Sequence, residues 1–127
     1  MNTAVVSVGS NINPHQNIDA AKELISGKFK LISISSFVIT EPIGFKEQDD
    51  FLNGAFLIQT GLDLEGLNDV LKKIEIDMGR VKTSNKEGPR IIDLDIIIWN
   101  NKIIDDDVYK RTFLQKSVIE LLPDFKF

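Results

Sequence analysis

Two aspartates occupy alternate positions in the otherwise apolar segment GPRIIDLDIII, residues 88–98. If this segment is a strand, Asp93 and Asp95 lie on one face, about 6 to 7 Å apart, because side chains alternate and each residue rises about 3.3 Å. Two ionised carboxylates at this spacing repel each other where the dielectric constant is low, so a cation is expected between them. Oxygen ligands favour Mg²⁺, which typically takes one or two carboxylates together with substrate phosphates.

Basic residues precede the acidic pair. The segment RVKTSNKEGPR, residues 80–90, has four basic side chains and a Gly-Pro pair, and is expected to be an exposed, mobile loop. Its part from Arg80 to Gly88 is expected to close over a nucleotide. Phosphates held by metal ions and by these cations would satisfy both features, as in phosphoryl transfer. The D-x-D spacing alone favours the alternative that Asp93 and Asp95 pair with Arg80, Arg90 or a helix lysine on a solvated face.

A second group of candidate residues lies in TEPIGFKEQDDFLN, residues 40–53. Phe45, Phe51 and Asn53 offer aromatic faces and an amide with both donors and an acceptor, which suits a flat heteroaromatic ligand. The alternatives are a core position for Phe51 and a turn position for Asn53.

The composition limits the possible classes of protein. A chain of 127 residues with 43% hydrophobic content is long enough for one domain, residues 1–127. The absence of cysteine excludes disulfides and thiolate metal sites and fits a cytoplasmic protein. A net charge of −4 argues against a nucleic-acid partner, and no apolar run approaches the roughly 20 residues of a membrane helix. We expect no nucleic-acid or membrane partner, and a monomer.

The elements that must position these residues follow the order strand, helix, strand, strand, helix, strand. Runs of β-branched and aromatic residues predict strands at 3–8, 31–40, 53–60 and 91–99. This order predicts an α+β, ferredoxin-like βαββαβ fold with a four-stranded antiparallel sheet, helices on one face and a short C-terminal helix. Alternation along the last strand places Ile91, Ile97 and Trp99 on the face of the aspartates, and Ile92, Leu94, Ile96 and Ile98 on the other.

Capping residues and apolar spacing predict three helices. The first is expected to have Asn13 as its cap and Pro14 at its first position. The second is expected to be capped by Asp63 and to end at Gly79. The last is short, with Thr112 as its candidate cap.

Four motifs occur in order along the chain: VSVGSN (6–11), T-x-P-x-G with F-L-N (40–53), I-E-x-x-x-G-R (74–80) and G-P-R-x-x-D-L-D-I (88–96). Together they resemble the hydroxymethyl-dihydropterin pyrophosphokinase family of folate biosynthesis, of which the last motif is the signature. The resemblance implies attack of the pterin hydroxymethyl oxygen on the β-phosphorus of ATP, transfer of pyrophosphate and release of AMP.

The resemblance also implies a role for individual residues. It implies that Asp93 and Asp95 bind two Mg²⁺ ions, which bridge the phosphates of the co-substrate ATP. It implies phosphate contacts on the catalytic loop by Arg80, Lys82 and Arg90. It implies that the pterin is surrounded by Thr40, Ile43, Phe51, Asn53 and Phe113, and that the nucleotide lies near Glu75, Arg90, Ile96 and Arg111.

The chain departs from the family pattern in two places. Glu87 stands where the family usually has a tryptophan before G-P-R, and the segment before the last helix is shortened to IIDDDVYKRTF, residues 103–113. These departures leave open a catalytically degenerate paralogue that binds a pterin or a nucleotide. A small-ligand regulatory domain on the same fold is a third hypothesis, although it would not need a metal-binding carboxylate pair.

Overall fold

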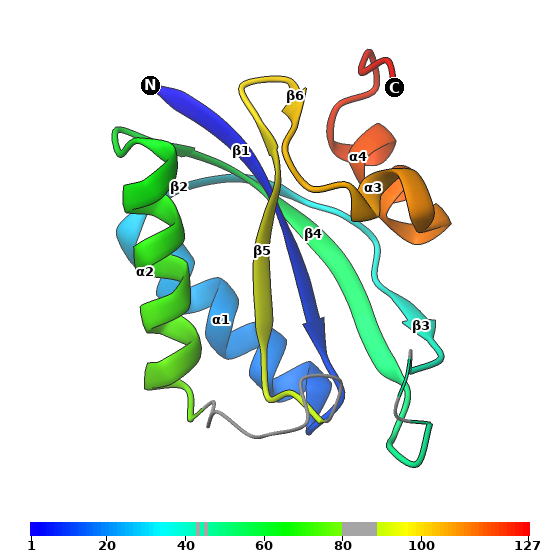
Figure 1. Ribbon diagram of the computed structural model, residues 1–127. Coiled ribbons are helices and arrows are strands. Elements are labelled where there is room, and N and C mark those ends of the chain that lie inside the picture. The colour runs from blue at the N-terminus through cyan, green and yellow to red at the C-terminus, as the bar shows by residue number, and fades with distance from the viewer. Residues whose placement is uncertain (43, 45, 80–88) are drawn as a thin grey trace.

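The computed structural model describes residues 1–42, 44, 46–79 and 89–127. Within these residues, six strands form a single antiparallel sheet (Figure 1). The strands are β1 (Asn2–Ser10), β2 (Lys30–Ile34), β3 (Val38–Thr40), β4 (Phe51–Thr60), β5 (Asp93–Trp99) and β6 (Lys102–Ile103). Their order across the sheet is β2-β4-β1-β5-β6, and β3 pairs with the first residues of β4. The central strand β1 therefore lies between β4 and β5.

Helices cover both faces of this sheet. They are α1 (Pro14–Lys28), α2 (Leu64–Asp77), α3 (Asp107–Lys110) and α4 (Thr112–Leu121). In Figure 1, α1 and α2 lie on one side of the strands, and α3 and α4 lie on the other. Among the described helices, none has the length and apolar character needed to cross a membrane.

The prediction of an α+β fold with an antiparallel sheet is confirmed, whereas the prediction of four strands is wrong. The expected strand at 31–40 is divided into β2 and β3 by residues 35–37, where the Ser35 hydroxyl accepts a hydrogen bond from Ala55 N at 2.8 Å. The expected last strand turns at Asn100 and Asn101, whose φ angles are 48° and 66°, and returns as β6. Two left-handed residues are typical of a two-residue hairpin turn, and asparagine adopts this conformation readily.

Each face of the sheet carries its own apolar core. On the first face, the fully buried Ile25 of α1 and Leu71 of α2 belong to one cluster with Phe56. On the second face, Val118 of α4 belongs to a cluster with Val5. Alternate residues of the same strands therefore supply both cores, and the C-terminal helices take the face opposite to α1 and α2.

A β-bulge changes the direction of the last side chains of β5. Val5 pairs with Ile98 whereas Val6 pairs with Ile96, so Ile97 is the extra residue. Consequently Ile97 and Ile98 both belong to the second core, and Trp99 packs against the first. The expected faces of Ile98 and Trp99 were wrong for this reason. The aspartates precede the bulge, where the pairing with β1 is regular.

The helix ends agree only in part with the sequence pattern. Asp63 caps α2 by accepting a hydrogen bond from the backbone N–H three residues later, at 2.7 Å, and Gly79 follows the helix with φ 101°. Both predictions are confirmed. Asn13 precedes α1 in a left-handed conformation, φ 40°, and its side chain makes no capping hydrogen bond. The positions of Asn13 and Pro14, the cap position and the first residue of α1, are nevertheless as predicted. Thr112 is the first residue of α4 and Arg111 is its cap position, so the prediction for Thr112 is wrong.

Candidate active site

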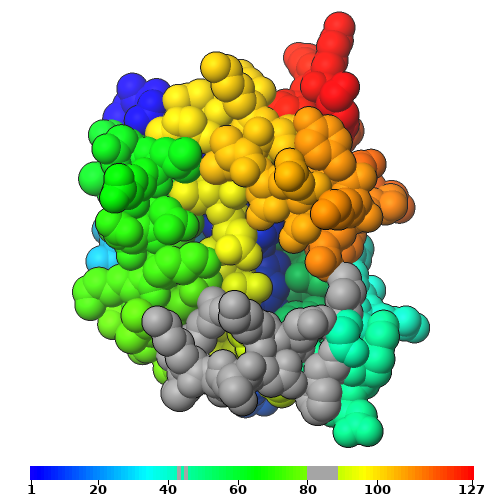
Figure 2. Space-filling view, in the orientation of Figure 1, coloured from blue at the N-terminus to red at the C-terminus, as the bar shows by residue number. Residues whose placement is uncertain are grey.

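A cavity of about 240 Å³ opens on the second face of the sheet. Figure 2 shows this hollow between β5, in yellow, and the orange C-terminal helices, with β1 visible in blue at its bottom. Residues from five separate segments line it: Ser7, Val8, Gly9, Thr40, Glu41, Phe51, Asn53, Arg90, Asp93, Asp95, Asp107, Arg111, Phe113 and Leu114. These segments meet because β4 and β5 flank β1 and because α3 and α4 cover only part of this face.

The two aspartates of β5 lie side by side in this cavity. Asp93 is paired with Gly9 and Asp95 with Ser7, so two small residues of β1 lie opposite the two carboxylates. Both aspartates are half-buried. Within the described ranges no group of three or more His, Cys, Asp or Glu side chains forms a metal site. A pair of carboxylates nevertheless fits Mg²⁺, which commonly completes its coordination with water and substrate phosphates.

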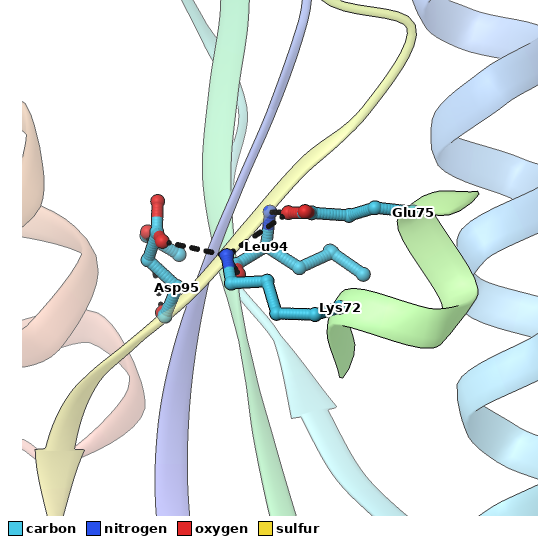
Figure 3. A network of polar contacts seen from close by, with 5 residues as sticks. Lys72, Glu75, Leu94 and Asp95 are labelled. Carbon is cyan, nitrogen blue, oxygen red and sulfur yellow. Dashed lines mark hydrogen bonds and ion pairs between the residues drawn. The ribbon is translucent and has the colours of Figure 1, made fainter. Parts of the chain in front are cut away.

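Lys72 of α2 connects Asp95 to a buried carboxylate (Figure 3). Its ammonium donates hydrogen bonds to Asp95 Oδ1 at 3.0 Å, to Leu94 O at 2.7 Å and to Glu75 Oε2 at 3.2 Å. Glu75 is 2% exposed, and its Oε2 also accepts a hydrogen bond from Leu94 N at 2.7 Å. Among the described residues, β6 pairs with residues 98 and 99 of β5 and does not reach Leu94. The side chains of Lys72 and Glu75 instead form hydrogen bonds with the backbone C=O and N–H of Leu94.

The ammonium of Lys72 remains charged at neutral pH. Burial lowers its pKa, but the carboxylates of Asp95 and Glu75 raise it by more, so the pKa lies above its ordinary value. Asp95 thus has a charged cationic partner at neutral pH. A helix lysine was among the partners considered from the sequence, and here it pairs with an aspartate that also lines a cavity.

An amide and two aromatic rings border the cavity further along β1. Asn53 Nδ2 donates a hydrogen bond to Thr40 Oγ1 at 2.5 Å. Gly9 lies opposite Asn53 on β1, and a Cβ atom at Gly9 would come within 2.5 Å of Asn53 Oδ1. The missing side chain of Gly9 therefore provides the space that the Asn53 amide occupies. Phe51 and Phe113 line the same cavity from β4 and α4.

Asn11 joins two segments that border the cavity. Its Nδ2 donates to Gln48 Oε1 at 2.7 Å and to Asp49 O at 3.1 Å, and its Oδ1 accepts from Arg90 N at 2.8 Å. Its backbone N–H also donates to Arg90 O at 3.1 Å. Since Asn11 is buried, these hydrogen bonds replace water and fix the chain before β4 relative to the chain before β5.

The cavity brings together eight of the residues that the family resemblance implies: Thr40, Phe51, Asn53, Arg90, Asp93, Asp95, Arg111 and Phe113. Glu75 and Ile96 do not line it, because Glu75 is buried on α2 and Ile96 belongs to the first core. Ile43, Phe45, Arg80 and Lys82 lie outside the described residues, as does the loop expected to close over a nucleotide. The roles of all these residues stay predictions.

Sequence reasoning missed other residues of the site. Ser7 and Gly9 had a visible signal, since small residues at alternate positions of an apolar strand leave space on one face. Asp107 lies four residues before Arg111, with 3.7 Å between its Oδ2 and the arginine Nε, and such spacing is recognisable once a helix is expected there. Lys72 gave no signal, because its contact with Asp95 depends on where α2 packs against β5.

The family model described as 7,8-dihydro-6-hydroxymethylpterin-pyrophosphokinase matches residues 5–123. A 2-amino-4-hydroxy-6-hydroxymethyldihydropteridine pyrophosphokinase of Haemophilus influenzae is 34% identical over 135 residues, covering 98% of this chain and 84% of that protein. The protein of the same name from Campylobacter jejuni is 38% identical over 106 residues, covering 81% and 67%. A folate synthesis bifunctional protein of Arabidopsis thaliana is 34% identical over 128 residues, covering 93% of this chain and 26% of that protein.

Proposed function

The chain belongs to the 7,8-dihydro-6-hydroxymethylpterin-pyrophosphokinase family, and we propose on this premise that it transfers pyrophosphate from ATP to hydroxymethyl-dihydropterin in folate biosynthesis. The observation that best supports a working site is the cavity in which Asp93 and Asp95 meet Asn53 and two aromatic rings. An acidic pair suits a metal–phosphate group, and the amide with the rings suits a flat heterocycle. The same cavity therefore offers suitable groups for both substrates of the transfer.

Asp93 and Asp95 are the residues that would hold Mg²⁺. Bound there, the metal would neutralise charge on the phosphate oxygens of ATP. Arg90 and Arg111 line the cavity beside the carboxylates and would bind the remaining phosphate oxygens, since a guanidinium group matches phosphate geometry.

The pterin would occupy the end of the cavity at Asn53. The amide of Asn53, oriented by Thr40, provides hydrogen-bonding groups for the edge of the ring, and Phe51 and Phe113 provide apolar faces. In the reaction, the hydroxymethyl oxygen forms a bond to the β-phosphorus as the bond to the α,β-bridging oxygen breaks. AMP leaves with that oxygen, and the hydroxyl proton passes to solvent. The protein supplies positioning and charge and no covalent nucleophile.

No observation favours the catalytically degenerate paralogue or the regulatory domain. The shortened segment before α4 still contributes Asp107, Arg111 and Phe113 to the cavity. Since a single chain supplies carboxylates, guanidinium groups, an amide and aromatic rings for both substrates, we propose that a monomer carries out the reaction. A chain without cysteine needs no oxidising compartment, which is consistent with action in the cytoplasm.

Asp95→Asn tests the proposal. We expect the wild-type protein to form AMP only when hydroxymethyl-dihydropterin, ATP and Mg²⁺ are all present, and chelation of Mg²⁺ to abolish this. The variant keeps the shape of the side chain but loses the charge that a metal requires, so AMP formation should fall by about 100-fold or more. Its melting temperature should change little, because a half-exposed ion pair contributes only about 0–1 kcal/mol.

Asp77→Asn is the matched control. Asp77 is also an aspartate paired with a lysine, Lys73, at 3.4 Å, but it lies on the exposed side of α2 and does not line the cavity. Its substitution should leave AMP formation unchanged. A wild-type protein that makes no AMP, or an Asp95→Asn variant with wild-type activity, would contradict the proposal.

A further inference from the structure

Lys72 is anchored independently of the aspartate with which it pairs. Two of its three acceptors, Leu94 O and Glu75 Oε2, lie outside the cavity lining. They are held in turn by the β-sheet and by the hydrogen bond from Leu94 N to Glu75. Figure 3 shows the ammonium between Asp95 on one side and Leu94 and Glu75 on the other. If the Asp95 carboxylate binds another cation, Lys72 therefore keeps two acceptors.

The neighbouring lysine differs. Among the described residues, Lys73 pairs with Asp77 across one turn of α2, at 3.4 Å, and its side chain is 73% exposed. The side chain of Lys72 is 37% exposed and meets three acceptors at 2.7 to 3.2 Å. Ordering a lysine side chain costs conformational entropy, so these three hydrogen bonds must compensate for it.

We propose that Lys72 is a built-in counter-cation of the metal site, which neutralises Asp95 in the ligand-free protein and opposes the binding of a divalent cation there unless nucleotide phosphates bind with it. This inference rests on the proposed role of Asp93 and Asp95 as metal ligands. It adds a residue that makes the site select a metal–nucleotide complex over the free metal.

The physical basis is the repulsion between two fixed positive charges. Lys72 Nζ is 3.0 Å from Asp95 Oδ1, so any cation on that carboxylate is close to the ammonium. Repulsion between a single and a double charge at short range remains substantial at the effective dielectric constants of protein surfaces. Phosphate oxygens that arrive with the metal add negative charge, which offsets the ammonium. The penalty then applies mainly to the metal alone.

Lys72→Gln tests this inference because glutamine keeps an N–H donor for Leu94 O and loses the charge. The dissociation constant of Mn²⁺ for the nucleotide-free protein is measured by electron paramagnetic resonance of the unbound metal. We expect about tenfold tighter binding by the variant, since solvent at the 43% exposed Asp95 side chain moderates the full Coulomb effect. The affinity for the Mg²⁺ complex of α,β-methylene-ATP, measured by calorimetry, should change by a smaller factor.

Three further variants provide controls. Lys72→Arg keeps the charge and should bind Mn²⁺ as the wild type does. Lys73→Gln removes a neighbouring charge outside the network and should also leave Mn²⁺ binding unchanged. Lys72→Met is a second neutral variant, whose apolar stem resembles that of lysine. Thermal unfolding without metal shows which of the two neutral variants is folded. A folded neutral variant of either kind serves for the comparison.

The outcomes separate this inference from the proposed function. If the wild type binds Mn²⁺ but the neutral variants bind it equally or more weakly, the inference is wrong and the metal site stands. If Lys72→Arg shows the same tighter binding as Lys72→Gln, charge is not the cause and the inference is also wrong. If the wild type binds no Mn²⁺, with or without the nucleotide analogue, the metal assignment and the inference fail together.

Discussion

The missing side chain at position 9 determines where the Asn53 amide can lie. In Gly9→Ala the new methyl group would come within 2.5 Å of Asn53 Oδ1, so the end of that side chain must move. Moving a terminal amide costs little stability, and the free energy of unfolding should change by less than about 1 kcal/mol. At its proposed position the pterin edge would then lose the Asn53 amide, so the KM for hydroxymethyl-dihydropterin should rise about tenfold.

Gly27→Ala is the control for this prediction. Gly27 lies in α1, and apart from its two chain neighbours and the backbone of its own helix, no atom lies within 4 Å of a Cβ placed there. Alanine at this position should leave the KM unchanged and raise the free energy of unfolding by up to about 1 kcal/mol, because glycine is the poorer helix former. An unchanged KM in both variants, measured from initial rates of AMP formation, would show that Gly9 does not act through Asn53.

Individual residues differed in how far the sequence revealed them. The acidic pair was visible because aspartates are unusual in an apolar strand, and its motif carried the family resemblance, which is confirmed. Lys72 was not visible, since nothing in the pattern of α2 distinguishes it from Lys73. The difference between these two lysines arises only when the helix packs and one of them meets the edge of β5.

At the scale of elements, the sequence predicted where strands lie better than how they pair. The run Ile96–Trp99 is apolar at every position, so its side chains could face either core. The pairing with β1 decides, because Val5 and Val6 take partners that skip Ile97. A bulge of this kind has no local signature in a uniformly apolar run, and the faces of Ile98 and Trp99 could not be predicted for that reason.

Asn11 connects elements that the sequence left separate, and its removal should affect stability more than a typical surface change. In Asn11→Ala, the buried side chain no longer accepts from Arg90 N or donates to Asp49 O and Gln48. Loss of these partners should lower the free energy of unfolding by about 2–3 kcal/mol, measured by urea denaturation. Asn11→Asp keeps an acceptor for Arg90 N and should lose less. Equal stabilities of the wild type and Asn11→Ala would contradict this role.

At the scale of the whole molecule, one sheet carries two cores, and the site lies at the edge of the second. The strand β1 contributes Val6 to the first core and Val5 to the second, while Ser7 and Gly9 line the cavity. The helices α3 and α4 complete the second core and also contribute Arg111 and Phe113 to the cavity. The C-terminal segment therefore contributes both to the second core and to the cavity, which links the stability of this face to the geometry of the cavity.

Because both cores share their strands, the two faces should unfold together. Leu71→Ala in the first core should cost about 2–5 kcal/mol and Val118→Ala in the second about 1–3 kcal/mol, since both side chains are fully buried. Trp99 is the single tryptophan and packs against the first core, so its fluorescence reports that face, whereas far-ultraviolet circular dichroism reports all the helices. In each variant the two signals should give the same urea midpoint. If Val118→Ala shifted the circular dichroism transition but left the Trp99 transition in place, the faces would unfold independently. The second core would then not be held by the sheet it shares with the first.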